Sequence, residues 1–214
     1  MKKIFILTVT IVITALVSMA FMYPAQKIML AEKANKAVEP GKWTVDKAHS
    51  NVKFNVTHLV VSEVEGSFKL FDGSMENTKS DLSDAKINFT VDVNSINTDN
   101  EKRDGHLKSD DFFNAGRFPS MKFTSTSMKS AGDNKYKLAG DLTIRDVTKP
   151  VVFDVTYGGS VAAMGTTKLG FKAKTTINRF DYSLKWDKAT ESGGLVVSKD
   201  VDIIVNAELN KVKE

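Results

Sequence analysis

The chemistry open to this chain is limited first by its three histidines, His49, His58 and His106, because the sequence contains no cysteine. Without cysteine there are no disulfides, thiolate nucleophiles, zinc ribbons or iron–sulfur clusters. A zinc site would have to bring all three histidines together, although no close histidine pair occurs in the sequence. No serine–histidine–aspartate signature, phosphate-binding glycine loop or paired-carboxylate motif is present either. The sequence therefore predicts neither catalytic residues nor a metal site.

The remaining polar candidates are side chains that could contact the head of a ligand. Arg103, His106 and Arg179 are the residues best placed to meet an anionic or polar group. His58 ends an alternating run on the same face as Phe54. It could fix a ligand head inside an apolar cavity, or it could be a half-exposed histidine at a strand end. On the residues alone we favour the strand-end interpretation.

From residue 43 onward, apolar residues recur at every second position. The clearest alternating runs are 52–58, 87–93, 136–144, 151–157, 169–177 and 201–209. Alternation of this period is typical of antiparallel strands with one buried and one wet face. Further strands are expected over 43–47, 64–71 and 121–128. The total is then about eight or nine strands.

Turn signals separate these runs and favour a compact all-β fold. They are Asp72-Gly73, residues 132–134, Gly158-Gly159 and Gly193-Gly194. The alternation is lost over 101–115, where we expect a loop with a short helix. Long strands at 135–145 and 168–178 favour a tilted barrel over a sandwich. The predicted fold class is all-β, an antiparallel eight-stranded up-and-down barrel with a short helical insertion.

The buried faces of the predicted strands are rich in phenylalanine, of which the chain has 13. The phenylalanines at core-facing positions are Phe54, Phe68, Phe89, Phe123, Phe153 and Phe171. Each of them alone is explained by a phenylalanine-rich core, whereas together they could line an elongated apolar cavity. Phe112 and Phe113 are candidates to gate its mouth. Composition does not distinguish a filled barrel from a hollow one.

The N-terminus has the pattern of an export signal. Lys2 and Lys3 precede an apolar run that extends to Tyr23. Ser18 and Ala20 are small residues suited to cleavage after Ala20, and an uncleaved anchor to about residue 23 is the alternative. Both place the rest of the chain in the periplasm or an equivalent exported compartment. The predicted organisation is a signal over 1–20, a linker over 21–40 and a barrel domain over 41–214.

The net charge of +4 belongs mainly to the N-terminal segment. Five of the 30 basic residues and two of the 26 acidic residues lie in 1–40, which leaves 25 basic and 24 acidic residues in 41–214. A nearly neutral domain does not have the basic surface typical of nucleic-acid binding, so we expect no nucleic-acid partner.

A series of short motifs runs through the predicted domain. They are Trp43-Thr44-Val45-Asp46, His49-Ser50, Val52-Lys53-Phe54, His58-Leu59, Gly66-Ser67-Phe68, Ser95-Ile96-Asn97-Thr98, Arg103-Asp104-Gly105-His106-Leu107, Asp111-Phe112-Phe113, Phe118-Pro119, Phe123, Leu142-Thr143-Ile144, Thr148-Lys149-Pro150-Val151, Asn178-Arg179 and Val201. Each is weak alone, but the ordered set resembles the YceI-like family, exported proteins of lipocalin-like barrel fold that bind polyisoprenoid lipids. Two positions depart from the family pattern, which usually has glycine where Asp146 and Ser183 stand here.

The resemblance implies a barrel that binds, and carries or sequesters, a long-chain isoprenoid or related amphipathic lipid of the polyprenyl phosphate or quinone type. It assigns to the channel and its mouth Phe54, His58, Phe89, Phe112, Phe113 and Phe123. It assigns to the ligand head Arg103, His106 and Arg179. No cofactor other than the bound lipid is expected, the protein is predicted to be a homodimer, and membrane contact is expected only through the N-terminal segment or during ligand exchange.

Two other functions stay open at this point. The protein could be an enzyme acting on a lipid or isoprenoid, with His106 or His58 as the acid–base group and Arg103 as an anion clamp. It could also be a ligand-free barrel with a structural or stress-related role. A filled interior would favour the ligand-free barrel.

Overall fold

The computed structural model describes residues 37–189 and 195–213. The predicted signal over 1–20, most of the predicted linker and the predicted Gly193-Gly194 turn lie outside the described residues. In the part of the chain that is described, no helix is both long enough and apolar enough to cross a membrane.

The described residues contain eleven strands. The strands are β1 (Gly41–Val45), β2 (Asn51–His58), β3 (Ser62–Phe68), β4 (Phe71–Asn77), β5 (Lys86–Asp92), β6 (Ile96–Asn97), β7 (Ser120–Ser130), β8 (Lys135–Ile144), β9 (Val147–Ala163), β10 (Thr166–Asn178) and β11 (Val197–Lys211). The helical elements are η2 (Val93–Ser95), α2 (Glu101–Lys108) and η3 (Arg179–Tyr182). The short helix α2 falls in the segment 101–115, where it was predicted.

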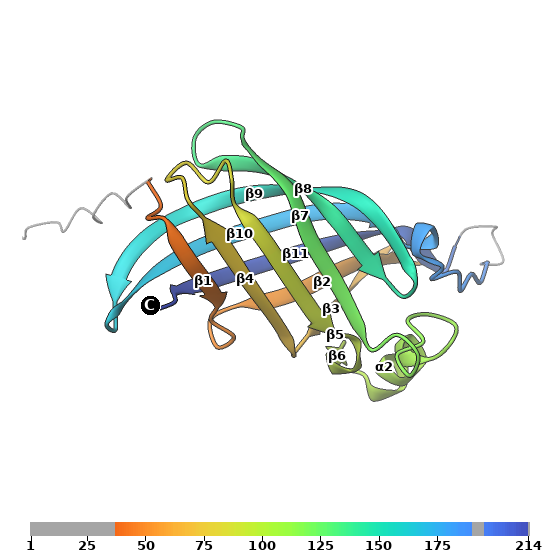
Figure 1. Cartoon of the computed structure of the whole chain (residues 1–214). Coiled ribbons are helices and arrows are strands. Elements are labelled where there is room, and N and C mark those ends of the chain that lie inside the picture. Colours follow the sequence, from red (N-terminus) through yellow and green to blue (C-terminus); the bar gives the residue numbers. More distant parts are fainter. Residues whose placement is uncertain (1–36, 190–194, 214) are drawn as a thin grey trace, which may run out of the picture. The chain divides into compact units, whose positions relative to one another are not determined.

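Eight of the strands close into a barrel (Figure 1). Around the ring they follow the order β1, β4, β5, β7, β8, β9, β10 and β11, and β1 closes it by pairing with β11 from Trp43–Lys211 to Val45–Leu209. All the pairings around the ring are antiparallel. The N-terminal part of β11 pairs instead with β2, which continues to β3 and β6. The prediction of an antiparallel eight-stranded barrel with a short helical insertion is confirmed.

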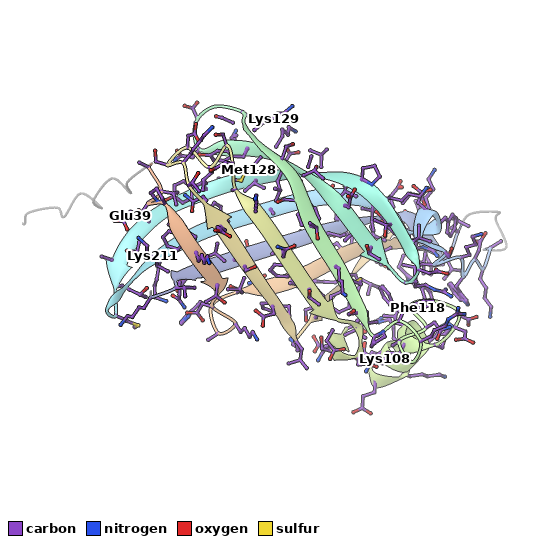
Figure 2. The ribbon with its side chains drawn as sticks, viewed as in Figure 1. Glu39, Lys108, Phe118, Met128, Lys129 and Lys211 are labelled. Atoms are coloured by element: carbon purple, nitrogen blue, oxygen red, sulfur yellow. The ribbon has the colours of Figure 1, made fainter. Side chains whose placement is uncertain are left out.

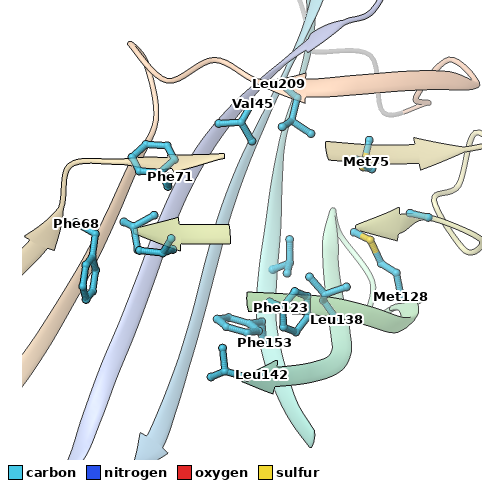
Figure 3. Packing of buried hydrophobic residues seen from close by; sticks show 14 of the residues in the cluster. Val45, Phe68, Phe71, Met75, Phe123, Met128, Leu138, Leu142, Phe153 and Leu209 are labelled. Atoms are coloured by element: carbon cyan, nitrogen blue, oxygen red, sulfur yellow. The ribbon is translucent and has the colours of Figure 1, made fainter. Parts of the chain in front are cut away.

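The alternation in the sequence becomes the inside and outside of the barrel. In β8, Leu138 and Leu142 are buried while Lys137 and Asp141 between them are exposed. Figure 3 shows both leucines packed beside aromatic rings from the neighbouring strands. Removing these apolar side chains from water stabilises the fold by about 1.5–3 kcal/mol for each fully buried residue.

Two predicted turns are wrong, because their glycines lie within strands. Asp72-Gly73 lies within β4, where a Cβ on residue 73 would come within 2.6 Å of the Phe89 ring. Gly158-Gly159 lies within the long strand β9, beside the irregular register at Gly170 of β10. Glycine in a strand often marks a bulge or a close approach rather than a turn. The turn that ends β9 contains Met164 and Gly165 instead.

The insertion after β6 is held by polar contacts. No residue of α2 is buried, and the Asn100 side chain caps the helix by accepting from the Arg103 N–H at 3.0 Å. Thr98 donates its hydroxyl to Asp104 at 2.6 Å and accepts from Arg103 Nε at 2.8 Å. These bonds fix the position of the start of the insertion. Phe112 and Phe113, which follow α2 in the chain, pack in the barrel core.

The two ends of the barrel are marked by different residues in Figure 2. Lys108 and Phe118 lie at the end that holds α2, which we call the α2 end. Glu39 and Lys211 lie at the opposite end, where their charged groups form an ion pair at 2.6 Å.

Candidate functional site

The interior of the barrel holds an apolar cavity of about 230 Å³. Protein interiors rarely contain voids much larger than a water molecule, so this volume is not a packing defect. Its walls come mostly from the inward-facing aliphatic and aromatic residues of the strands. A cavity of this composition excludes water and accommodates an apolar chain.

Phenylalanine rings form much of the wall, and three of them lie over glycines of the neighbouring strand. Phe54 is directly opposite Gly66, and Phe89 is directly opposite Gly73. A Cβ on Gly66 would lie 2.5 Å from Cε1 of Phe54, and a Cβ on Gly140 would lie 2.6 Å from Cε2 of Phe123. The missing side chains give the rings room to lie against the sheet.

Further aromatic contacts fix the orientation of these rings. Phe123 and Phe153 lie side by side in Figure 3; their ring centroids are 5.3 Å apart and the rings are nearly perpendicular. The ring centroid of Phe68 lies 5.7 Å from that of Phe54 and 6.0 Å from that of Phe113. These distances fall in the range at which aromatic pairs attract, so the wall contains two aromatic clusters, one of Phe54, Phe68 and Phe113 and one of Phe123 and Phe153.

Arg179 is the one buried charged side chain among the described residues, with 3% of its surface exposed, and it also lines the cavity. Its Nη1 donates to the carbonyls of Leu184 at 2.6 Å and Trp186 at 2.8 Å. Its Nε donates to the carbonyl of Ser198 at 2.8 Å, and Nη2 to that of Val197 at 3.0 Å. In the described chain these bonds use four of the five guanidinium N–H groups.

The charge of Arg179 is compensated by carbonyl dipoles and not by a carboxylate. No ion pair joins it to an acidic residue in the described part of the chain, and the ring of Phe180 lies 4.4 Å from its guanidinium carbon. Burial lowers the pKa of Arg179, and the charge of Asp187 opposes that shift. The guanidinium nevertheless stays protonated at neutral pH. The wall of a mainly apolar cavity therefore includes one buried, positively charged side chain, and the described residues offer no partner for the second N–H group of Arg179 Nη2.

The structure brings together six of the nine residues predicted to bind a ligand. Those that line the cavity are Phe54, Phe89, Phe112, Phe113, Phe123 and Arg179. Those that do not line it are His58, Arg103 and His106. Contact with a ligand stays a prediction for all nine, and the position in the fold supports it for the first six.

The three residues outside the cavity have partners within the fold. Arg103 is exposed and binds Thr98 through both Nε and Nη2. His106 Nε2 lies 2.8 Å from an Asp111 carboxylate oxygen. His58 ends β2, where it pairs with Val197 and Ser62.

His106 acts on the cavity wall indirectly. Its ring is 5.1 Å from that of Phe112 and 5.4 Å from that of Trp186, nearly perpendicular to both. Phe112 in turn has the Arg179 guanidinium 5.9 Å from its ring. His106 therefore packs against Phe112, which lines the cavity, and does not line the cavity itself.

A second cluster of polar residues lies where β1, β10 and β11 meet. Asp46, His49 and Glu208 bring their ligand-type atoms within 4.8 Å of one another. Lys168 Nζ is 3.1 Å from Asp46 and 2.5 Å from Glu208, so an ammonium group already neutralises the carboxylates. Hydrogen bonds from His49 and Lys168 hold the pKa of Asp46 well below its ordinary value. The cluster is an ion-pair network that fastens three strands.

Sequence reasoning missed many aliphatic residues of the wall. Met121, Met128 and Leu184 line the cavity, and so do the inward-facing residues of β11. The alternation identifies the inward positions of β11, but it does not separate residues that fill a core from residues that line a cavity. That separation depends on how far apart the strands are held.

The two departures from the family pattern have different structural meanings. Ser183 has a φ of 60°, in the left-handed region that glycine adopts without strain. At the other turn the left-handed residue is Arg145, with a φ of 57°, and not its neighbour Asp146. Arg145 Nη1 donates to the carbonyls of Phe112 and Ser183 at 3.0 Å each, which joins this turn to the α2 end.

Comparison with known proteins gives matches across the barrel. Residues 43–209 match the YceI-like domain. UPF0312 protein SAS2572 of Staphylococcus aureus strain MSSA476 is 40% identical over 170 residues, which are 78% of this chain and 96% of that protein. The crystal structure of a Campylobacter jejuni YCEI protein is 33% identical, with a TM-score of 0.64, and the match covers 78% of this chain and 96% of the other.

Two more distant structures share the fold. BcnA of Burkholderia cenocepacia has a TM-score of 0.68 at 24% identity, over 77% of this chain and 98% of its own. A domain from Saccharophagus degradans, described as polyisoprenoid binding, has a TM-score of 0.60 at 16% identity, over 79% of this chain and 98% of its own.

Proposed function

The chain belongs to the YceI-like family, and we propose that it binds a long-chain isoprenoid or related amphipathic lipid inside its barrel. The single observation that carries this proposal is the apolar cavity of about 230 Å³ with the buried cation Arg179 in its wall. The described ligand of the Saccharophagus degradans domain agrees with the proposal, although at 16% identity that likeness concerns the fold.

The two parts of such a ligand match the two parts of the cavity. An isoprenoid chain gains about 0.8 kcal/mol for each carbon that leaves water, so a five-carbon unit gains about 4 kcal/mol. Arg179 supplies a positive charge for a phosphate head, or a hydrogen-bond donor for a quinone carbonyl. A polyprenyl phosphate and a prenyl quinone are therefore the ligand types we propose.

We further propose that the protein carries or sequesters this lipid after export, as a periplasmic or membrane-anchored protein. The basic and apolar start of the chain supports export. A barrel that shields an apolar chain would allow the lipid to exist in an aqueous compartment, which its solubility alone does not. We keep the homodimer as a proposal from the family resemblance.

The two other functions have less support from the geometry. An enzyme using His58 or His106 would need one of them at the cavity, and neither lines it. A ligand-free structural barrel would be expected to fill its interior, and this interior holds a cavity.

Native mass spectrometry of the protein purified from an exporting host, followed by solvent extraction, tests the proposal. A stoichiometric prenyl lipid is the expected result. A ligand-free mass that does not change after incubation with a prenyl quinone or a polyprenyl phosphate would contradict it.

A matched pair of variants separates interior binding from surface binding. Ala173 faces the cavity and Lys172 next to it is exposed. Ala173→Phe should fold, because the cavity has room for the ring, and should lose most of the bound lipid. Lys172→Phe adds the same ring outside the barrel and should keep the lipid. Equal lipid content in both variants would place the ligand elsewhere.

A further inference from the structure

The turn between β2 and β3 exposes three consecutive aliphatic side chains. Leu59 is 42% exposed, Val60 79% and Val61 85%. Leu59 and Val60 have φ values of 50° and 66°, and the Val61 N–H donates to the His58 carbonyl at 3.3 Å. Two central residues with positive φ are typical of hairpin turns that contain asparagine and glycine. A β-branched valine in this conformation is a strong outlier.

The other left-handed non-glycine residues of the described chain are of two kinds, namely aspartate or asparagine, and the four residues Leu82, Arg145, Met164 and Ser183. Aspartate or asparagine occupies a left-handed conformation at Asp99, Asn114, Asp133 and Asn134. Leu82 is also left-handed, but it is completely buried, so packing accounts for it. Met164 is a single exposed apolar residue in this conformation, whereas the β2–β3 turn is the only place in the described chain where two consecutive aliphatic residues adopt it and both are exposed. Strain of this kind at an exposed position points to a function.

The turn lies close to the part of the cavity wall that contains Val197 and Arg179. The Leu59 N–H donates to the Val196 carbonyl at 2.9 Å. The next residue, Val197, lines the cavity, and its carbonyl accepts from Arg179 Nη2. A partner that contacts the turn would therefore be close to Arg179, where the head of the ligand is expected.

We propose that residues 59–61 insert into the surface of a lipid bilayer when the barrel takes up or releases its ligand. The inference rests on the proposed function, because a lipid that the barrel carries has to leave and re-enter a membrane. A stable protein complex buries about 800 Å² on each partner, which three side chains on one turn do not provide. A bilayer needs no complementary surface, and aliphatic side chains enter the boundary between head groups and acyl chains.

The test uses residues 37–214, which contain the whole domain match at 43–209, and the matches to the solved relatives cover 96–98% of those chains. The tip variant carries Leu59→Asn and Val60→Gly, the preferred residues for this turn. The control is Met164→Asn, since Met164 is also exposed and left-handed, at 92% exposure and a φ of 53°, in the β9–β10 turn. Partition onto phosphatidylcholine vesicles is measured by flotation, and unfolding temperature by circular dichroism.

The tip variant should bind vesicles at least tenfold more weakly than the wild type, while its unfolding temperature stays equal or rises. Met164→Asn should bind vesicles like the wild type. Equal binding by the tip variant, or an equal loss with Met164→Asn, would overturn the inference. So would a change of oligomeric state in the tip variant without a change in vesicle binding, because the turn would then contact a second copy.

Native mass spectrometry of the same samples without vesicles keeps this inference separate from the proposed function. If the barrel holds no prenyl lipid, the proposed function fails whatever the vesicles show. If the wild type and the tip variant hold the lipid equally and bind vesicles equally, only the role of the turn is wrong.

Discussion

Gly66→Ala should destabilise the protein mainly through the ring of Phe54. A Cβ on residue 66 would lie 2.5 Å from Cε1 of Phe54 and nearer still to Cζ, with Cγ2 of Thr98 at 2.9 Å. Ordinary carbon contacts are about 3.5–4.0 Å, so the ring has to move by roughly 1 Å. Phe54 is free to move only into the cavity, because Gly66 is its direct neighbour in the sheet.

The size of the effect follows from two opposing contributions. Forcing a methyl group into a packed site costs typically about 1–3 kcal/mol. Replacing glycine at a position without a left-handed φ stabilises by about 0.4–1 kcal/mol through the unfolded chain. We expect Gly66→Ala to lower the free energy of unfolding by about 1–2 kcal/mol. In a Phe54→Leu background, which lacks the two ring atoms nearest the added Cβ and keeps only Thr98 Cγ2 at 2.9 Å, the same change should be close to neutral.

Urea unfolding of the wild type, the two single variants and the double variant gives the coupling between the residues. We expect a coupling of about 2 kcal/mol, within the range for residues in direct contact. The displaced ring should also reduce the amount of prenyl lipid in Gly66→Ala, with recovery in the double variant. The same loss of stability from Gly66→Ala in both backgrounds would refute the idea that Gly66 makes room for the Phe54 ring.

Three further predictions concern other parts of the fold. Asp46→Asn should lower the unfolding temperature at pH 7, and the difference from wild type should shrink below about pH 4. Hydrogen bonds from His49 and Lys168 hold the pKa of Asp46 below its ordinary value of 3.8. The carboxylate therefore stabilises the fold fully above pH 3.8, and this stabilisation is lost as the pH falls towards the lowered pKa. A difference that is constant with pH would contradict this. Ser183→Gly should raise the free energy of unfolding by about 1 kcal/mol, since it removes the left-handed strain at a φ of 60°, and urea unfolding should show no change if that strain is absent. Arg179→Met leaves four carbonyls without their donor and should cost on the order of 3 kcal/mol, whereas a loss below about 1 kcal/mol would mean that water replaces the guanidinium.

The fold was predictable because the alternation carries the information directly. Apolar residues at every second position specify which side of each strand faces inward, and β8 follows the pattern almost without exception. The errors came from glycine. Gly73 and Gly158 are the same residue type that turns use, and the sequence around them does not show that an aromatic ring or a bulge of the neighbouring strand needs the space.

The site was predictable in part for a related reason. Phe54, Phe89 and Phe123 were found because they lie on alternating strands, and Arg179 because of its side-chain chemistry and its place in the Asn178-Arg179 motif. Arg103 and His106 have the same chemistry as Arg179, yet Thr98 and Asp111 bind them outside the cavity. Arg103, His106 and Arg179 all lie in or next to segments without alternation, so the sequence pattern does not show which of the three side chains points into the barrel. Their positions become clear only once these segments are folded.

The cavity depends on contacts between residues of neighbouring strands and cannot be predicted from any one strand. Phe54, Phe89 and Phe123 would fill the barrel if their rings crossed it, and each of them lies instead over a glycine of the adjacent strand. A pair made of a phenylalanine and a glycine provides apolar surface without filling the lumen, because the ring occupies the place that the missing side chain leaves. The hollow interior therefore depends on pairings across strands. Adding one methyl group at Gly66 should therefore reduce lipid capacity more than removing a methylene group from an aliphatic wall residue such as Ile203, because only the first change moves a ring into the lumen.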